Sequence, residues 1–251
     1  MTTYLRSYPL ENFGNIQHAF FTRNGGVSQD VYNSLNAAYS KGDKLEHILE
    51  NRRRIARTFG EENEQLVSLR QIHSDIVLPV TRPFRHGDIP EGDGLVTNAP
   101  GLIIGVITAD CVPVLLYDPS AGVVGAVHAG WRGATSRVLL NAIAEMNKLG
   151  AYDIRAAIGP CIWQESYEVG RDVYDCLINP DKYCQPGNDE KWQFDLPGYV
   201  RDRLIDHGVK QVSESMANTY ADEASFFSYR RATHRKQNGT GHMISAIKLL
   251  Y

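Results

Sequence analysis

One cysteine and two histidines, far apart in the sequence, have side chains that could do chemistry together. Cys111 follows His73 by 38 residues, and His128 follows Cys111 by 17 residues. Structural zinc sites usually have four ligands in closely spaced pairs, whereas catalytic zinc sites commonly have three His or Cys ligands and one position open for water. Three ligands from three remote segments are therefore typical of a catalytic metal site.

Other interpretations of the same residues stay open at this point. Cys111 could be a core thiol, and each histidine could be a structural residue. A Cys-His pair could instead act as nucleophile and base, since a thiolate is a good nucleophile as well as a good metal ligand. Two histidines and one cysteine are also the blue-copper ligands, for which Met146, Met216 or Met243 could supply the axial group. A non-enzymatic binding module is a further alternative.

Short apolar runs surround Cys111 and His128 and must position them. These runs are Ile103–Ile107, Val112–Leu116 and Val123–Val127. They are rich in β-branched residues and bounded by Gly, Pro or Asp, which is typical of strands buried on both faces. Cys111 falls between the first two runs and His128 follows the third, so both side chains are expected at strand ends.

The remaining elements follow from similar patterns. The other expected strands are His18–Phe21, Leu66–Leu69, Ile76–Val80, Leu95–Thr97, Ile154–Ile158, Gln211–Glu214, Phe226–Tyr229 and residues 243–250. The expected helices run from a cap at Asp43 to Gly60, from 138 to Gly150, over Val169–Ile178, and from Asp195 to Gly208. In the first helix, the side chains expected to face mainly solvent are Arg52, Arg53, Arg54 and Arg57.

Strands and helices are interspersed, but several connections are too short for parallel crossovers, which need a dozen or more residues. The sheets should therefore be mixed or antiparallel, with helices packed outside. No repeat, linker or low-complexity segment divides the chain. We predict an α/β (α+β) fold with a single domain over residues 1–251.

Composition limits the class of protein. The chain is 43% hydrophobic and 22% charged, which is ordinary for a soluble protein. A net charge of −3 favours neither nucleic acid nor an anionic membrane as a partner. The N-terminus lacks a signal-peptide pattern, which indicates a cytoplasmic protein. The four cysteines form no CxxC pair, so they are expected to be free thiols or ligands, with Cys161 packed in the core.

The motifs that contain these residues resemble one known family. RQIHSDIV, ITADC, HAGWRGAT, AIGPCI and FFSYRR are similar to the YfiH/laccase-domain family, whose members are called multicopper polyphenol oxidase, purine nucleoside phosphorylase or peptidoglycan editing factor. The resemblance covers nearly the whole chain and is most specific at ITADC and HAGWRG. It implies a YfiH-like fold and a zinc site made by His73, Cys111 and His128.

The resemblance also implies purine nucleoside chemistry: phosphorolysis of adenosine, inosine and methylthioadenosine to base and sugar 1-phosphate, together with deamination of adenosine. Zinc lowers the pKa of a bound water, which allows attack on C6 of adenine. Asp110 and Asp93 are the candidates for the acid or base that deamination needs. Arg132, at the start of a predicted helix, is the first candidate for binding phosphate. Arg23 and Arg230 follow.

Two other activities are alternatives for such a site. A copper-dependent, laccase-like polyphenol oxidase could use the same ligands, although a trinuclear copper centre needs many more histidines, often in His-x-His pairs. This chain has eight His and no such pair. A Cys-His hydrolase or amidase acting on a peptidoglycan precursor would use Cys111 as its nucleophile.

The chain departs from the family pattern in its C-terminal part. The family motif after FFSYRR usually reaches TGR, whereas this chain has Thr240-Gly241-His242. A Cys that is common before FFSYRR is absent from ANTYADEA. The metal ligands are untouched, and the departure bears on how the C-terminal segment binds substrate.

Overall fold

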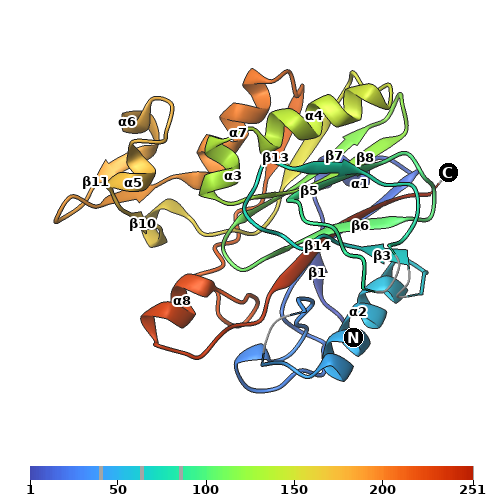
Figure 1. The fold of residues 1–251 in the computed structure, drawn as a ribbon, viewed down its shortest axis with the longest axis horizontal. Coiled ribbons are helices and arrows are strands. Elements are labelled where there is room, and N and C mark those ends of the chain that lie inside the picture. Colours follow the sequence, from blue (N-terminus) through green and yellow to red (C-terminus); the bar gives the residue numbers. More distant parts are fainter. Residues whose placement is uncertain (40–41, 63–64, 85–86, 251) are drawn as a thin grey trace.

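Three sheets form the framework of the residues described by the computed structural model, which are 1–39, 42–62, 65–84 and 87–250 (Figure 1). The five-stranded sheet contains, in order, β1 (Tyr4–Leu5), β2 (Ile16–Phe21), β14 (Met243–Leu249), β6 (Ile103–Thr108) and β3 (Leu66–Val67). The six-stranded sheet contains β13 (Gln211–Glu214), β9 (Arg155–Ile158), β7 (Val112–Asp118), β8 (Val123–Ala129), β5 (Gly94–Thr97) and β4 (Val77–Pro79). The small sheet contains β10 (Glu168–Val169), β12 (Trp192–Phe194) and β11 (Cys184–Pro186).

Helices lie between and outside these strands. In chain order they are α1 (Tyr8–Glu11), α2 (Leu45–Thr58), α3 (Trp131–Thr135), α4 (Val138–Lys148), α5 (Arg171–Tyr174), α6 (Pro180–Tyr183), α7 (Leu196–Asp206) and α8 (Tyr229–His234). Short 3-10 helices in the described part of the chain include Asp30–Tyr32 and Gln164–Ser166. Among the described residues, none of the helices combines the length and the apolar character needed to cross a membrane.

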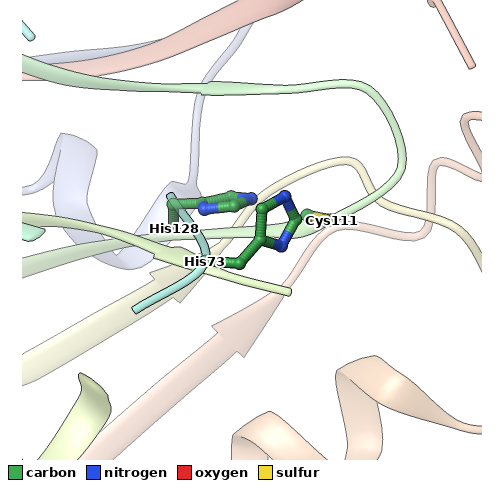
Figure 2. A group of neighbouring side chains, drawn as sticks. All are labelled: His73, Cys111 and His128. Atoms are coloured by element: carbon green, nitrogen blue, oxygen red, sulfur yellow. The ribbon is translucent and has the colours of Figure 1, made fainter. Parts of the chain in front are cut away.

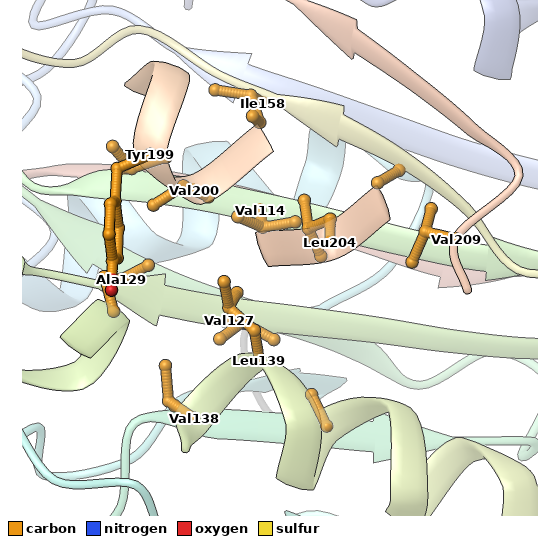
Figure 3. Close-up of a cluster of buried hydrophobic side chains, with 14 of the residues drawn as sticks. Val114, Val127, Ala129, Val138, Leu139, Ile158, Tyr199, Val200, Leu204 and Val209 are labelled. Carbon is orange, nitrogen blue, oxygen red and sulfur yellow. The ribbon is translucent and has the colours of Figure 1, made fainter. Parts of the chain in front are cut away.

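The two large sheets pack face to face, and helices cover their outer faces (Figure 1). Ile104 of β6 and Leu115 of β7 belong to the cluster between the sheets. Val114 of β7 points the other way and packs with Leu139 of α4 in the cluster under α4 and α7 (Figure 3). Ile55 of α2 packs on the outer face of the five-stranded sheet. The strands between these layers are apolar on both faces, as the sequence predicted.

The predicted fold class is confirmed, with mixed sheets and helices on the outside. Three strand pairs are parallel among the described strands, namely β13 with β9, β3 with β6 and β4 with β5. The long central pairs β7 with β8, β7 with β9 and β14 with β6 are antiparallel. The four cysteines are free thiols, and Cys161 is fully buried in the core as expected.

Two predicted elements in the second half of the chain are wrong. Phe226–Tyr229 forms no strand, because Ser228 caps α8 by accepting a hydrogen bond from the N–H of Arg231. The apolar residues before it are buried without sheet pairing. The helix expected over Val169–Ile178 is reduced to α5, since pairing with β12 takes its first residue into β10.

Two predictions around α2 are also wrong. The side chain of Asp43 does not cap the helix, whose N-cap is Lys44; its carboxylate accepts hydrogen bonds from Ser28 and Asn36 instead. Arg52 does not face solvent, because it is 3% exposed and donates to the backbone carbonyls of Ala37 and Leu66. Its guanidinium therefore joins α2 to two neighbouring segments.

Candidate metal centre

Strand pairing brings the segments of Cys111 and His128 together. In the antiparallel pair of β7 and β8, Val112 lies opposite Ala129. Cys111, directly before β7, is therefore placed beside Gly130, directly after β8. His128 is the second-last residue of β8 and is buried.

His73 reaches the same place from an exposed connection between β3 and β4. Its backbone has a positive φ of 59°, which is uncommon for a residue other than glycine. The buried carboxylate of Asp93 holds this connection, because it accepts hydrogen bonds from the backbone N–H groups of His73 (3.1 Å) and Ser74 (2.6 Å) and from the Ser74 hydroxyl (2.7 Å). The sequence expectation that His73 lies between strands is met.

The structure brings His73, Cys111 and His128 together (Figure 2). One ligand atom from each residue can be chosen so that all three lie within 4.8 Å of one another. Zinc bonds of ~2.0–2.3 Å place tetrahedral ligand atoms roughly 3.3–3.8 Å apart, so only a small closure is needed. His73 is exposed and Cys111 half-buried, whereas His128 is buried, so the group has one open side.

Gly130 leaves room for an ion in this group. A Cβ atom at this position would lie 2.9 Å from Nδ1 of His73 and 3.0 Å from Sγ of Cys111. The donor set is of the His/Cys type that zinc prefers. The residues present therefore fit a zinc ion, and they also fit copper in the chemistry of their ligands.

Asp93 fixes the orientation of the His128 ring. Nδ1 of His128 lies 2.8 Å from Oδ1 of Asp93, which leaves Nε2 for the metal side. Burial lowers the pKa of His128, but the Cys111 thiolate and the hydrogen bond to Asp93 outweigh it and raise the pKa to about 9. Burial raises the pKa of Asp93, but hydrogen bonds from His128 and Ser74 bring it to about 2. Asp93 is thus a carboxylate that orients a candidate ligand histidine.

We expect Asp93→Asn to weaken zinc binding about 10- to 100-fold, because loss of a group that hydrogen-bonds to a ligand histidine typically has an effect of this size. Competition with a chelator of known affinity measures the change. Ser74→Ala is the matched control, since it removes one hydrogen bond to the same carboxylate but leaves the bond to His128. Equal affinities for the Asn variant and the wild type would contradict the role of Asp93.

A cavity of about 1040 Å³ adjoins the three side chains. Besides them, its wall includes Asp110, Trp131, Arg132, Tyr167, Arg230 and His242. The exposed guanidinium of Arg132 lies 4.3 Å from the ring centre of Trp131, and that of Arg230 lies 5.3 Å from the ring centre of Tyr167. Two cations therefore flank the candidate metal centre.

Arg23 does not line this cavity. Its guanidinium donates to the carbonyls of Asn33 (2.7 Å) and Glu223 (3.1 Å) and lies 4.5 Å from the ring centre of Phe227. These contacts hold Arg23 away from the cavity wall, which Arg132 and Arg230 line.

Asp110 lines the cavity, but its carboxylate is already engaged. It accepts hydrogen bonds from the hydroxyls of Thr219 (2.7 Å) and Ser228 (2.9 Å) and from the backbone N–H of Arg230 (2.7 Å). Burial, only partly offset by these bonds, raises its pKa. Asp110 therefore ties the start of α8, and with it Arg230, to the Cys111 turn.

Tyr167 and Trp131 are cavity residues that the sequence analysis did not single out. The Tyr167 hydroxyl has no hydrogen-bond partner among the described residues. Burial and the nearby Cys111 charge raise the pKa of Tyr167, so the phenol stays protonated and can donate. An isolated tyrosine carries no sequence signature, whereas Trp131 lies within the HAGWRG motif, which could have drawn attention to it.

The fold and this site agree with what comparison with known proteins shows. Residues 17–250 match the family described as multi-copper polyphenol oxidoreductase laccase. The chain belongs to this family, as its sequence motifs indicated.

Two curated relatives carry a more specific name. The chain is 37% identical to a purine nucleoside phosphorylase of Deinococcus radiodurans, over 93% of this chain and 89% of the relative. It is 35% identical to the purine nucleoside phosphorylase YfiH of Escherichia coli, over 91% of this chain and 92% of the relative.

Solved structures show the same fold. YlmD from Geobacillus stearothermophilus superposes with a TM-score of 0.89 at 30% identity, covering 99% of this chain and 96% of that one. YfiH of Bacillus licheniformis superposes with a TM-score of 0.87 at 31% identity, covering 93% and 92%.

Proposed function

We propose that this protein is a zinc-dependent purine nucleoside enzyme. It converts adenosine, inosine and methylthioadenosine with phosphate into the free base and the sugar 1-phosphate, and it also deaminates adenosine. The observation that carries the proposal is the group of His73, Cys111 and His128 at the wall of a cavity with two flanking cations. The names of the two curated relatives support the same reaction.

Different residues are assigned to metal binding and to positioning. His73, Cys111 and His128 would hold the ion, and Asp93 would orient His128. Zinc would supply a Lewis acid and an activated water. Since both oxygens of Asp93 and Asp110 already accept hydrogen bonds within the protein, we propose that these carboxylates act by positioning, and that they do not transfer the proton themselves.

We assign the binding of the phosphate substrate to Arg132 and Arg230. Each guanidinium lies against an aromatic ring at the cavity wall, which orients it and leaves N–H groups for an anion. Arg230 also donates one hydrogen bond to the carbonyl of Glu168 (2.8 Å). Arg23 is left out of this assignment because of its contacts outside the cavity.

The test is metal analysis followed by product analysis. Protein purified without added metal is incubated with adenosine and phosphate, and the products are separated by chromatography. We expect adenine, ribose 1-phosphate and some inosine, with loss of all three after verified metal removal and recovery on adding zinc. Turnover that persists in fully stripped protein would overturn the proposal.

We expect Arg132→Ala to lower kcat/KM for phosphorolysis about 10- to 100-fold, the effect of one charge-assisted hydrogen bond. Deamination should change less than about threefold, because water replaces phosphate as the nucleophile. Initial rates of adenine and inosine release measure the two reactions in one sample. Arg137→Ala is the matched control, an exposed arginine nearby that does not line the cavity. Equal losses in both reactions would mean that Arg132 contacts the nucleoside.

Copper in the same ligands is the second candidate, favoured by the description of the family. Met146, Met216 and Met243, the possible axial ligands, do not line the described cavity. Met146 is buried under the six-stranded sheet, and Met243 accepts a hydrogen bond from the N–H of Phe227. Copper would therefore be held without a methionine. Oxygen uptake with a phenol by copper-loaded protein tests this function.

A further inference from the structure

His242 has a hydrogen-bonding capacity that the protein itself does not use. The ring lines the cavity, and neither of its nitrogens has a partner among the described residues. Six side-chain atoms in the described part of the chain are buried without a partner, and only Nδ1 of His242 belongs to a cavity residue. Buried polar groups without partners are rare and call for a physical reason.

The backbone presents this ring from a rigid support. The N–H of His242 donates to Oδ1 of Asn36 (3.0 Å), and its carbonyl accepts from the N–H of Ala37 (3.1 Å). The next residue begins the β14 ladder, with Met243 opposite Thr108. At Gly241 an added Cβ would lie 2.5 Å from the Phe227 ring, so the chain is closely packed there. The backbone that carries the ring is therefore held on both sides.

The His242 ring is uncharged near neutral pH, which suits an uncharged ligand. Burial lowers the pKa of His242, so the imidazole is neutral near pH 7. A neutral donor suits an uncharged acceptor, whereas the cationic arginines of the cavity wall suit an anion.

The two ring nitrogens differ in access. Nδ1 is completely buried without a partner, whereas Nε2 is not among the buried unpartnered atoms, and the residue lines the cavity. A proton on Nδ1 would be a buried donor without an acceptor, which is less favourable than a buried acceptor without a donor. The neutral ring therefore carries its proton on Nε2 and offers one N–H to the cavity.

We propose that His242 is a specificity-determining residue that donates a hydrogen bond from Nε2–H to an uncharged acceptor of the bound nucleoside. The inference rests on the proposed function and deepens it, since it separates the group that recognises the nucleoside from the arginines that hold phosphate. Ribose oxygens and purine ring nitrogens share the required chemistry. 2′-Deoxyadenosine and 7-deaza-adenosine distinguish two of these sources, because the analogue that lacks the acceptor should no longer respond to substitution of His242.

The experiment compares His242→Phe with His242→Gln in the zinc-loaded enzyme. The Phe variant keeps a ring in the cavity but has no donor, whereas the Gln variant keeps an N–H donor. We expect KM for adenosine to rise about tenfold in the Phe variant, the effect of one neutral hydrogen bond. KM for phosphate, kcat and zinc content should stay within about twofold, and Gln should restore most of the affinity. His207→Phe, at a histidine outside the cavity, is the control.

Each contrary result has a distinct meaning. An unchanged KM for adenosine in the Phe variant would overturn the inference, and so would a rise confined to KM for phosphate. Loss of zinc from that variant would show that His242 supports the metal site, which also overturns it. A zinc-loaded wild type that neither binds nor converts adenosine would refute the proposed function, and the inference would fall with it.

Discussion

Replacing Cys111 with alanine is expected to abolish zinc binding and adenosine turnover together. Two remaining histidines rarely hold the ion in a catalytic geometry. Substitution of a group that only hydrogen-bonds to a ligand typically lowers metal affinity or activity about 10- to 100-fold, so loss of a ligand should lower kcat/KM by more than about 100-fold. The fold should lose little stability in the presence of a chelator, since Cys111 belongs to none of the described apolar clusters. Metal analysis and product chromatography on one preparation measure both losses.

Cys176→Ala is the matched control, because its thiol is exposed and does not line the cavity. The experiment also separates the classes of enzyme. A Cys-His hydrolase would lose activity in Cys111→Ala, but its wild type would stay active after chelation of metal. A thiol-directed electrophile would modify Cys111 of that wild type and inactivate it. A copper oxidase would be inert with zinc and would take up oxygen with copper. Adenosine turnover by metal-free Cys111→Ala would contradict all three.

The second large effect is expected from Gly130→Ala. The added methyl group would lie 2.9 Å from Nδ1 of His73 and 3.0 Å from Sγ of Cys111, where it displaces two candidate ligands at once. Zinc affinity should therefore fall by more than about 100-fold, which exceeds the typical effect of losing one group that supports a ligand. The backbone itself accepts alanine, because Gly130 has an ordinary φ of −72°. Chelator competition and thermal unfolding without metal measure affinity and stability separately.

The control for this substitution is Gly14→Ala, where an added Cβ meets no atom within 4 Å. It should bind zinc as the wild type does. If Gly130→Ala retained wild-type zinc affinity, the ion would not occupy the space between His73 and Cys111. The proposed ligand set would then be wrong even if the protein contained zinc.

Local sequence patterns predicted the centre of the fold well. Strands β6, β7 and β8 begin where their apolar runs begin and extend only slightly beyond them, because burial on both faces requires such a composition. The pairing of β14 with both β2 and β6 could not be predicted in this way, since it joins residues far apart in the chain. Arg52 illustrates the same limit: a helical pattern does not reveal that distant carbonyls will satisfy a buried guanidinium.

In the candidate site, too, the sequence predicted some residues, whereas others required the structure. The motifs singled out His73, Cys111 and His128, and the fold places them together. Asp93 was chosen by its type as a possible acid or base, but its partners are His73 and His128, 20 and 35 residues away. Its positioning role depends on those contacts. Tyr167 could be identified as a site residue only from the structure, which places it on the same cavity wall.

The way in which the ligands are supported has a consequence for how the protein acquires its ion. Each candidate ligand is held by sheet pairing or by Asp93, and none of these supports exists in the unfolded chain. The three side chains therefore take up this geometry only as the chain folds. A folded site of this kind binds divalent ions in the Irving–Williams order, with copper above zinc. The supply of ions in the compartment where the chain folds, more than the ligand set itself, then decides whether the same site becomes a zinc or a copper centre.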